Sequence, residues 1–345
     1  MVHTRSAEVL EHDEQHPPRP RSAETPRRIR LRSLGEVGAL VVLIAVFSAL
    51  NPDSFPTVKN VQTILEQAAL PLIVGVGATL VILMGSIDLS VEGVMGASGM
   101  TFVLLSANSR NHLDLGPAAY VVAVAAGVAL GLLTGLVHTR LKVPTFITTL
   151  GVWYVGYGIA TILFGQAGIP FLTDKGAATW PSDRVAGLPH GFLLAAAVVV
   201  LGVLITRFTR LGRFAYAIGN NEAIARDNGV PVARYKIYVF ALAGGCSALA
   251  GVLGTLELGA GATTVGVGTL FLTIAAVVVG GTALGGGKGG VLRTTIGVFI
   301  LTVLNNGLIL SGVSPRIQSA VSGAILIVAI VAVAWPQRSR LRIAK

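Results

Sequence analysis

Long apolar stretches alternate with short polar connections along this chain. A helix needs about 20 mainly apolar residues to cross a bilayer. Ten stretches approach that length, with cores at 36–50, 65–84, 91–107, 117–138, 145–165, 190–206, 235–256, 269–284, 291–311 and 316–335. The pattern predicts an all-α fold, a polytopic membrane protein with about ten transmembrane helices.

The polar segments divide the chain into one membrane domain and two tails. Residues 1–35 are rich in Arg and Pro and too polar to bury a core, so we expect a disordered basic tail. Residues 36–335 form the predicted transmembrane domain, which contains one long polar segment at 207–236. Residues 336–345 are predicted to form a second basic tail.

Composition agrees with a membrane protein, because charged residues make up only 12% of the chain, about half the usual fraction of a globular protein. The net charge of +10 would suggest nucleic-acid binding in a soluble protein. Here the basic residues gather in loops and tails, and Lys and Arg prefer cytoplasmic loops. With an even number of spans and both termini cytoplasmic, 21 of the 26 fall on the cytoplasmic side. We therefore expect membrane lipid, and no nucleic acid, as a partner.

Two glycine-rich stretches interrupt the apolar pattern, GSIDLSVEGVMG at 85–96 and GTALGGGKGGVL at 281–292. Transporters often contain broken helices in corresponding halves, and their irregular backbone lines a cavity. We expect some helices of this chain to be broken in the same way.

The long polar segment contains, in order, the signals of a short helix. These are a capping amide at Asn220 or Asn221, an acid in the first turn at Glu222, a base in the last turn at Arg226, and a stop at Asn228 and Gly229 before Pro231. They predict a helix of about two turns. A helix this short is marginal in water, so its own protein or a partner must hold it.

This segment resembles the cytoplasmic coupling loop of ATP-binding cassette importer permeases, in the ribose-type (monosaccharide) branch. In that family the short helix docks into a groove on the ATPase subunit and transmits its closure to the spans. The positions that match the family pattern are Gly219, Asn221, Glu222, Ala225, Arg226 and Gly229. Ala223 stands where many members have a second Glu.

The resemblance extends over roughly residues 60–335. GSIDLSVEG is similar to the family's GGIDLSVGS, with Glu92 where a Gly is usual, and residues 274–308 resemble a second family block that ends in LNNGL. Just before that block, members commonly carry Glu and Asp, whereas residues 269–273 here are Thr, Leu, Phe, Leu and Thr. Thr134 stands where an Asn is common.

Four polar residues in apolar surroundings are candidates for a translocation pathway: Asp88, Ser90, Asn305 and Asn306. An ionised Asp at the centre of a lone membrane helix costs roughly 2.5 to 3.5 kcal/mol, so Asp88 should not face lipid. Asp88 or Ser90 can equally cap a helix that restarts at Val91. A role as a helix cap and a role in the pathway are compatible. The two amides can bond a hydroxylated solute or a neighbouring helix. Other acids near predicted span ends are interpreted as water-exposed: Glu66, Glu92 and Glu257.

The resemblance implies the permease subunit of an importer in the bacterial cytoplasmic (inner) membrane, moving a monosaccharide into the cytoplasm. It also implies an ATPase subunit that holds ATP and Mg²⁺, an extracytoplasmic solute-binding protein, and a second permease copy or a paralogue. We predict no enzyme and no cofactor in this chain, because GGGKGG around Lys288 lacks the Gly and the Ser or Thr of a phosphate loop. The alternative is a secondary transporter driven by an ion gradient, in which Asp88 would titrate or bind a cation.

Overall fold

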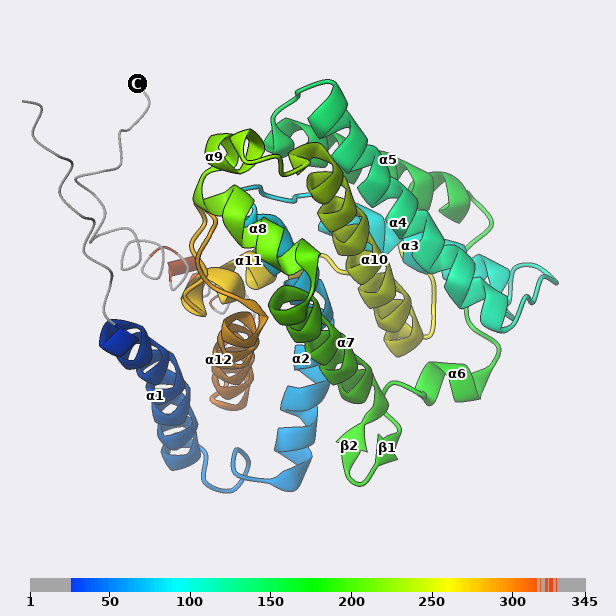
Figure 1. The fold of residues 1–345 in the computed structure, drawn as a ribbon. Coiled ribbons are helices and arrows are strands. Elements are labelled where there is room, and N and C mark those ends of the chain that lie inside the picture. Colours follow the sequence, from blue (N-terminus) through cyan, green and yellow to red (C-terminus); the bar gives the residue numbers. More distant parts are fainter. Residues whose placement is uncertain (1–25, 315–316, 318–319, 322, 325–326, 328–345) are drawn as a thin grey trace, which may run out of the picture.

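Helices dominate the chain, seen here in a computed structural model that describes residues 26–314, 317, 320–321, 323–324 and 327 (Figure 1). The helices are α1 (Pro26–Leu50), α2 (Val58–Leu83), α3 (Val91–Leu105), α4 (Pro117–Arg140), α5 (Thr145–Phe164), α6 (Lys175–Thr179), α7 (His190–Phe208), α8 (Arg210–Asn220), α9 (Glu222–Asp227), α10 (Val232–Leu258), α11 (Thr269–Val279) and α12 (Val291–Leu310). Two short antiparallel strands, β1 (Arg184–Val185) and β2 (Leu188–Pro189), form a hairpin before α7.

The helical elements follow the predicted apolar stretches. Among the described residues, six helices are long and apolar enough to cross a membrane: α2, α4, α5, α7, α10 and α12. Three shorter apolar helices, Gly35–Leu50 within α1, α3 and α11, account for three further stretches. The predicted stretch at 316–335 lies largely outside the described residues.

The connections of the bundle meet at two opposite ends. At one end, called the α9 end, Gly287 N–H bonds Leu83 O at 2.9 Å and Tyr216 Oη bonds Gly289 O at 2.9 Å. At the other, called the hairpin end, Gln62 Nε2 bonds Gly187 O at 3.0 Å, and residues 108 and 172 pair in a bridge. Figure 1 shows α8 and α9 far from the hairpin, with α7 running between them. Loops that the charge pattern assigns to one side therefore meet at one end.

Close helix packing at the centre comes from small residues. On α4, Gly127, Gly131 and Gly135 recur every four residues and lie against α10. A Cβ at Gly131 would collide with the carbonyl oxygen of Phe240. Such spacing lets two membrane helices approach until their backbones touch. α10 also packs against α2 and α3, so it lies at the core of the bundle.

Two apolar helices, α3 and α11, are short and follow non-helical segments. Only the segment before α3 overlaps a glycine-rich stretch noted in the sequence; the other stretch, 281–292, lies mainly in the connection between α11 and α12. Residues 86–90 have no regular secondary structure before α3 begins at Val91, and residues 259–268 are non-helical before α11 begins at Thr269. α3 has 15 residues and α11 has 11, so they are about 22 Å and 16 Å long, shorter than the roughly 30 Å hydrocarbon core.

The long polar segment contains more structure than predicted. It holds two helices, since α8 precedes α9, and only α9 follows from its capping signals. α8 buries Gly212, Ala215 and Ile218 on one side and exposes Arg210 and Arg213. From the sequence, the charged residues of this segment suggest a loop, but in the structure they form the polar face of an amphipathic helix.

Candidate functional site

α9 is the helix that the capping signals predict. Asn221, rather than Asn220, is its cap: the backbone there is extended, and the side chain accepts a hydrogen bond from Ile224 N at 3.1 Å. At the other end, Gly229 has a φ of +79° and donates its N–H to Arg226 O, and Val230 N–H bonds Ala225 O. A left-handed glycine closes the helix at its expected place.

One apolar residue anchors α9 to the bundle. Ala225 is 6% exposed and belongs to a cluster of buried side chains from α2, α8 and α10 that includes Met84, Ile218 and Phe240. One side of α9 is therefore packed against the ends of longer helices.

Gly219 forms the junction beneath α9. A Cβ there would collide with Leu83 O and lie 2.5 Å from Gly287 N. Leu83 ends α2 just before the first glycine-rich stretch, Gly287 belongs to the second, and the two atoms are hydrogen-bonded to each other. The sequence indicated that the stretches are alike; the structure brings them together at the end of α8, where only glycine fits.

Glu222 ties α9 to the transmembrane helices. One carboxylate oxygen lies 2.6 Å from the Arg226 guanidinium on α9, and the other lies 2.8 Å from Lys236 Nζ on α10. Partial burial would raise the pKa of Glu222. The hydrogen bond and charge of Lys236, with the charges of Arg226 and His138, outweigh that effect and hold the pKa below its ordinary value.

The tie continues into α4 through His138. Its Nδ1 lies 2.8 Å from the carbonyl oxygen of Val143, and a carbonyl can only accept, so Nδ1 carries the proton. Its Nε2 lies 3.3 Å from Lys236 Nζ and accepts from that ammonium. Lys236 is only 8% exposed, so both partners matter for its charge. Sequence reasoning missed Lys236 and His138, because 98 residues separate them and neither stands in a motif.

The outer side of α9 is open. Ile224 is 58% exposed, the Arg226 side chain is 67% exposed, and Asp227 is also exposed. An apolar side chain flanked by charges of both signs offers a contact surface for another protein.

The candidate pathway residues lie apart from α9. Asp88 and Ser90 are buried, and Asp88 Oδ1 accepts from Ser90 N at 2.8 Å and Ser90 Oγ at 2.6 Å. Asp88 thus accepts a backbone N–H just before α3, whereas the Ser90 side chain makes no capping bond. On α12, Asn306 is 2% exposed and its Oδ1 has no hydrogen-bond partner within the described residues. Its neighbour Asn305 is half-buried and has an interaction partner.

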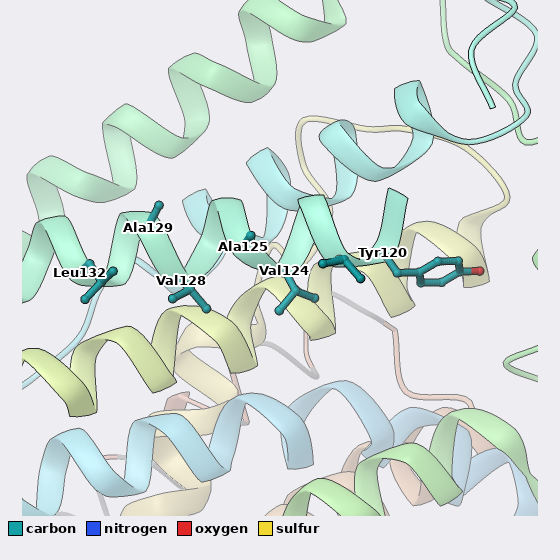
Figure 2. A pocket seen from close by; sticks show the side chains of 7 residues that line it. Tyr120, Val124, Ala125, Val128, Ala129 and Leu132 are labelled. Atoms are coloured by element: carbon teal, nitrogen blue, oxygen red, sulfur yellow. The ribbon is translucent and has the colours of Figure 1, made fainter. Parts of the chain in front are cut away.

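An apolar groove of about 580 Å³ runs along α4, as Figure 2 shows. Its lining is Tyr120, Val121, Val124, Ala125, Val128, Ala129 and Leu132. These side chains offer a hydroxylated solute almost no hydrogen-bonding groups, so the groove suits hydrocarbon and not a polar solute.

Comparison with known proteins identifies the kind of protein. The family described as "Branched-chain amino acid transport system / permease component" matches residues 60–330. The chain is 36% identical over 295 residues to the ribose import permease protein RbsC of Escherichia coli (strain K12), covering 85% of this chain and 90% of that protein.

Two further relatives in the same organism are the D-allose transport system permease protein AlsC and the galactose/methyl galactoside import permease protein MglC. The alignment with AlsC has 32% identity and covers 84% of this chain and 88% of AlsC. The alignment with MglC has 31% identity and covers 87% of this chain and 93% of MglC. No solved structure matches this chain. The family match over most of the sequence, together with a bundle of membrane-length helices, shows that the chain belongs to this family of transport permeases.

Proposed function

We propose that this chain is the membrane-spanning permease subunit of an ATP-binding cassette importer that moves a monosaccharide, a ribose-like sugar or related polyol, into the cytoplasm. The support is that relatives named for ribose, D-allose and galactose import align over most of both chains. A separate ATPase subunit would bind ATP and Mg²⁺, and this chain would act as a transport subunit with no cofactor of its own.

The observation that carries the proposal is the way α9 is held. Its inner side is fixed to α10 by Ala225 and Glu222, and its outer side presents Ile224 and Arg226. A partner that pushes on this outer side would move α10 and α4 with it, because Lys236 and His138 continue the contact. We assign ATPase coupling to Gly219, Asn221, Glu222, Ala225, Arg226 and Gly229.

The proposed topology places the α9 end in the cytoplasm, with ten spans in residues 36–335, the coupling loop at 207–236, and both tails, 1–35 and 336–345, inside. Charge supports this sidedness. Basic residues near the α9 end are Arg140, Lys142, Arg207, Arg210, Arg213, Arg226, Arg234, Lys236, Lys288 and Arg293, against Lys59, Arg110, Lys175 and Arg184 near the hairpin end. The membrane would be the bacterial cytoplasmic (inner) membrane.

The remaining partners would be an extracytoplasmic solute-binding protein at the hairpin end, a second permease copy or paralogue, and membrane lipid. Solute would pass near Asp88, Ser90, Asn305 and Asn306. In support, Asp88 and Ser90 are buried polar groups in the non-helical segment before α3, and Asn306 holds an unpaired buried amide oxygen among the described residues.

Reconstitution tests the proposal against its alternative, a secondary transporter driven by an ion gradient. The permease would be purified with the ATPase subunit and solute-binding protein of the proposed importer and placed in vesicles with radiolabelled D-ribose, D-allose or D-galactose. We expect uptake that requires ATP and survives an ionophore. Uptake that persists without ATP and stops with the ionophore would reject the importer.

A further inference from the structure

Glu92 belongs to α3, but its carboxylate serves another helix. Its Oε1 accepts hydrogen bonds from Gly268 N at 2.9 Å and Leu270 N at 3.2 Å, at the beginning of α11. The first N–H groups of a helix have no partner within that helix, and a negative charge is favoured there. Two amides therefore fix one carboxylate oxygen in place.

Helix lengths put this contact deep in the bundle. α11 ends at the α9 end, where residues 281–290 meet Leu83 and Tyr216. With 11 residues, it begins about 16 Å from that end. α3 ends at the hairpin end, where Leu115 N–H bonds Leu105 O. Its 15 residues place Glu92 about 20 Å from that end. In a hydrocarbon core of roughly 30 Å, both estimates put the carboxylate near mid-depth.

The second oxygen of Glu92 is available. Among the described residues, the hydrogen bonds of this side chain both go to Oε1, and Glu92 forms no ion pair. The residue is half-buried, so the free oxygen is accessible. Val267, just before α11, and Phe271, in its first turn, flank the two amides in sequence, and their side chains are 70% and 66% exposed. A carboxylate beside apolar side chains at this depth is not covered by lipid, because hydrocarbon would cost roughly 2.5 to 3.5 kcal/mol.

We propose that Glu92 is a solute-contacting residue of the translocation pathway, whose Oε2 accepts a hydrogen bond from a hydroxyl of a neutral polyhydroxylated solute. This inference rests on the proposed function and adds a residue to its pathway. A carboxylate is a pure acceptor, and a sugar hydroxyl is a donor that can meet it in a strong, charge-assisted bond. Because Oε1 is held by two amides, Oε2 is oriented before the solute arrives.

The geometry also separates a sugar from other solutes. An anionic solute would be repelled by the same carboxylate. A cation would need more ligands than one carboxylate, and the described residues contain no group of three or more His, Cys, Asp or Glu around a common point.

Glu92→Gln is the informative substitution. The amide oxygen of Gln can still accept from Gly268 and Leu270, so the beginning of α11 is kept. The amide nitrogen then takes the place of Oε2 and can only donate, so the bond from a solute hydroxyl is lost. Glu92→Ala removes both functions. Asp53→Asn is the matched control, because Asp53 is exposed in the loop before α2.

The test measures initial uptake of radiolabelled D-ribose, D-allose and D-galactose by vesicles that hold the complete transporter. We expect Glu92→Gln to lower ATP-driven uptake about tenfold, the effect of losing one charge-assisted bond, with unchanged thermal midpoint and ATP hydrolysis. Asp53→Asn should behave as wild type.

Wild-type uptake from Glu92→Gln, with loss only in Glu92→Ala, would leave Glu92 as a helix cap and overturn the inference while the proposed function stands. A sodium dependence of wild-type uptake that disappears in Glu92→Gln would overturn it in favour of a cation site. Absence of ATP-dependent uptake of every sugar by the wild-type complex would instead reject the proposed function, and the inference with it.

Discussion

Glu222 is the residue that joins the short helix α9 to the membrane bundle. Its two oxygens contact Arg226 on α9 and Lys236 on α10, and Lys236 is nearly buried. The family resemblance places Glu222 in the short helix that docks on the ATPase. The structure shows this side chain turned toward its own chain, so its effect on a partner would be indirect.

Replacement of Glu222 by Arg should uncouple ATP hydrolysis from transport. The new guanidinium would face the ammonium of Lys236. Removing one partner of a buried ion pair is strongly destabilising, because the other charge stays buried without a partner. The Glu222 side chain is 38% exposed, so solvent screens part of this effect. We expect uptake to fall about tenfold or more while the permease still inserts. The measurement is uptake per ATP hydrolysed in vesicles.

Charge exchange is the control for that variant. Glu222→Arg combined with Lys236→Glu restores an ion pair of reversed polarity between α9 and α10, so it should recover a substantial part of the uptake. Equal loss in the single and double variants would reject a coupling role for this ion pair.

The attachment of α9 should also depend on pH. The pKa of Glu222 is depressed in the folded protein, so its stabilising contribution is complete above the ordinary Glu pKa and is lost as the pH falls through the lower, folded value. A spin label at Ile224→Cys, on the exposed side of α9, should become more mobile as the pH falls below about 4. In a Lys236→Gln background the rise should begin at higher pH; an identical profile would exclude Lys236 as the cause.

Asp88 has a different role from Glu222, because its bonds are local. Asp88→Asn keeps an oxygen that can accept from Ser90 N and Ser90 Oγ, so we expect uptake to change less than about threefold if hydrogen bonding is the role of this side chain. Uptake and thermal stability of the same preparation decide the matter. Complete loss of uptake with normal stability would show that the charge itself serves the pathway.

At the scale of helices, the sequence predicted those helices whose limits are set by residues close together in the chain. α9 was predicted because a capping Asn, an acid, a base and a left-handed Gly all lie within a few residues. α8 was missed because its basic residues were interpreted as part of a loop, although Leu211, Phe214 and Ile218 recur at the spacing of one helical face. Apolar length located nine of the helices, and the stretches at 91–107 and 269–284 begin where α3 and α11 begin, but apolar length does not indicate how deep in the bundle these two helices begin.

Contacts between distant segments were beyond the reach of the sequence. Glu92 was interpreted as a water-exposed acid near a span end, yet it bonds amides 176 and 178 residues away. The contact also unites two departures from the family pattern, Glu92 in place of a Gly and uncharged residues in place of acids at 269–273. Nothing in either stretch alone points to the other.

The α4–α10 contact gives a prediction at the level of helix pairs. Gly131→Ala would place a methyl group against the carbonyl oxygen of Phe240, and overpacking of this kind costs typically about 1–3 kcal/mol. We expect a lower thermal midpoint in detergent. Gly158→Ala on α5 is the matched control, since no atom lies within 4 Å of its added Cβ, and it should be neutral or slightly stabilising. Equal midpoints for the two variants would mean that α4 and α10 are not packed through their backbones.

For the whole molecule, the orientation in the membrane decides whether α9 can contact a cytoplasmic ATPase subunit. An ATPase works in the cytoplasm, so the α9 end must lie inside, and the hairpin end must face a solute-binding protein outside. The chain has one cysteine, Cys246, which is buried, so single new cysteines can report each end. Asp53→Cys probes the hairpin end and Ile224→Cys the α9 end, because both residues are exposed.

The test applies a membrane-impermeant maleimide to cells whose cytoplasmic membrane is intact and from which any outer membrane has been removed. The reagent should label Asp53→Cys and leave Ile224→Cys unmodified. After the membrane is made permeable, both should react, and wild type should stay unlabelled throughout because Cys246 is buried. The reason is electrostatic: Lys and Arg concentrate near the α9 end, and such loops stay on the cytoplasmic side. Labelling of Ile224→Cys in intact cells would place α9 outside, where no ATPase could reach it, and the importer proposal would fail.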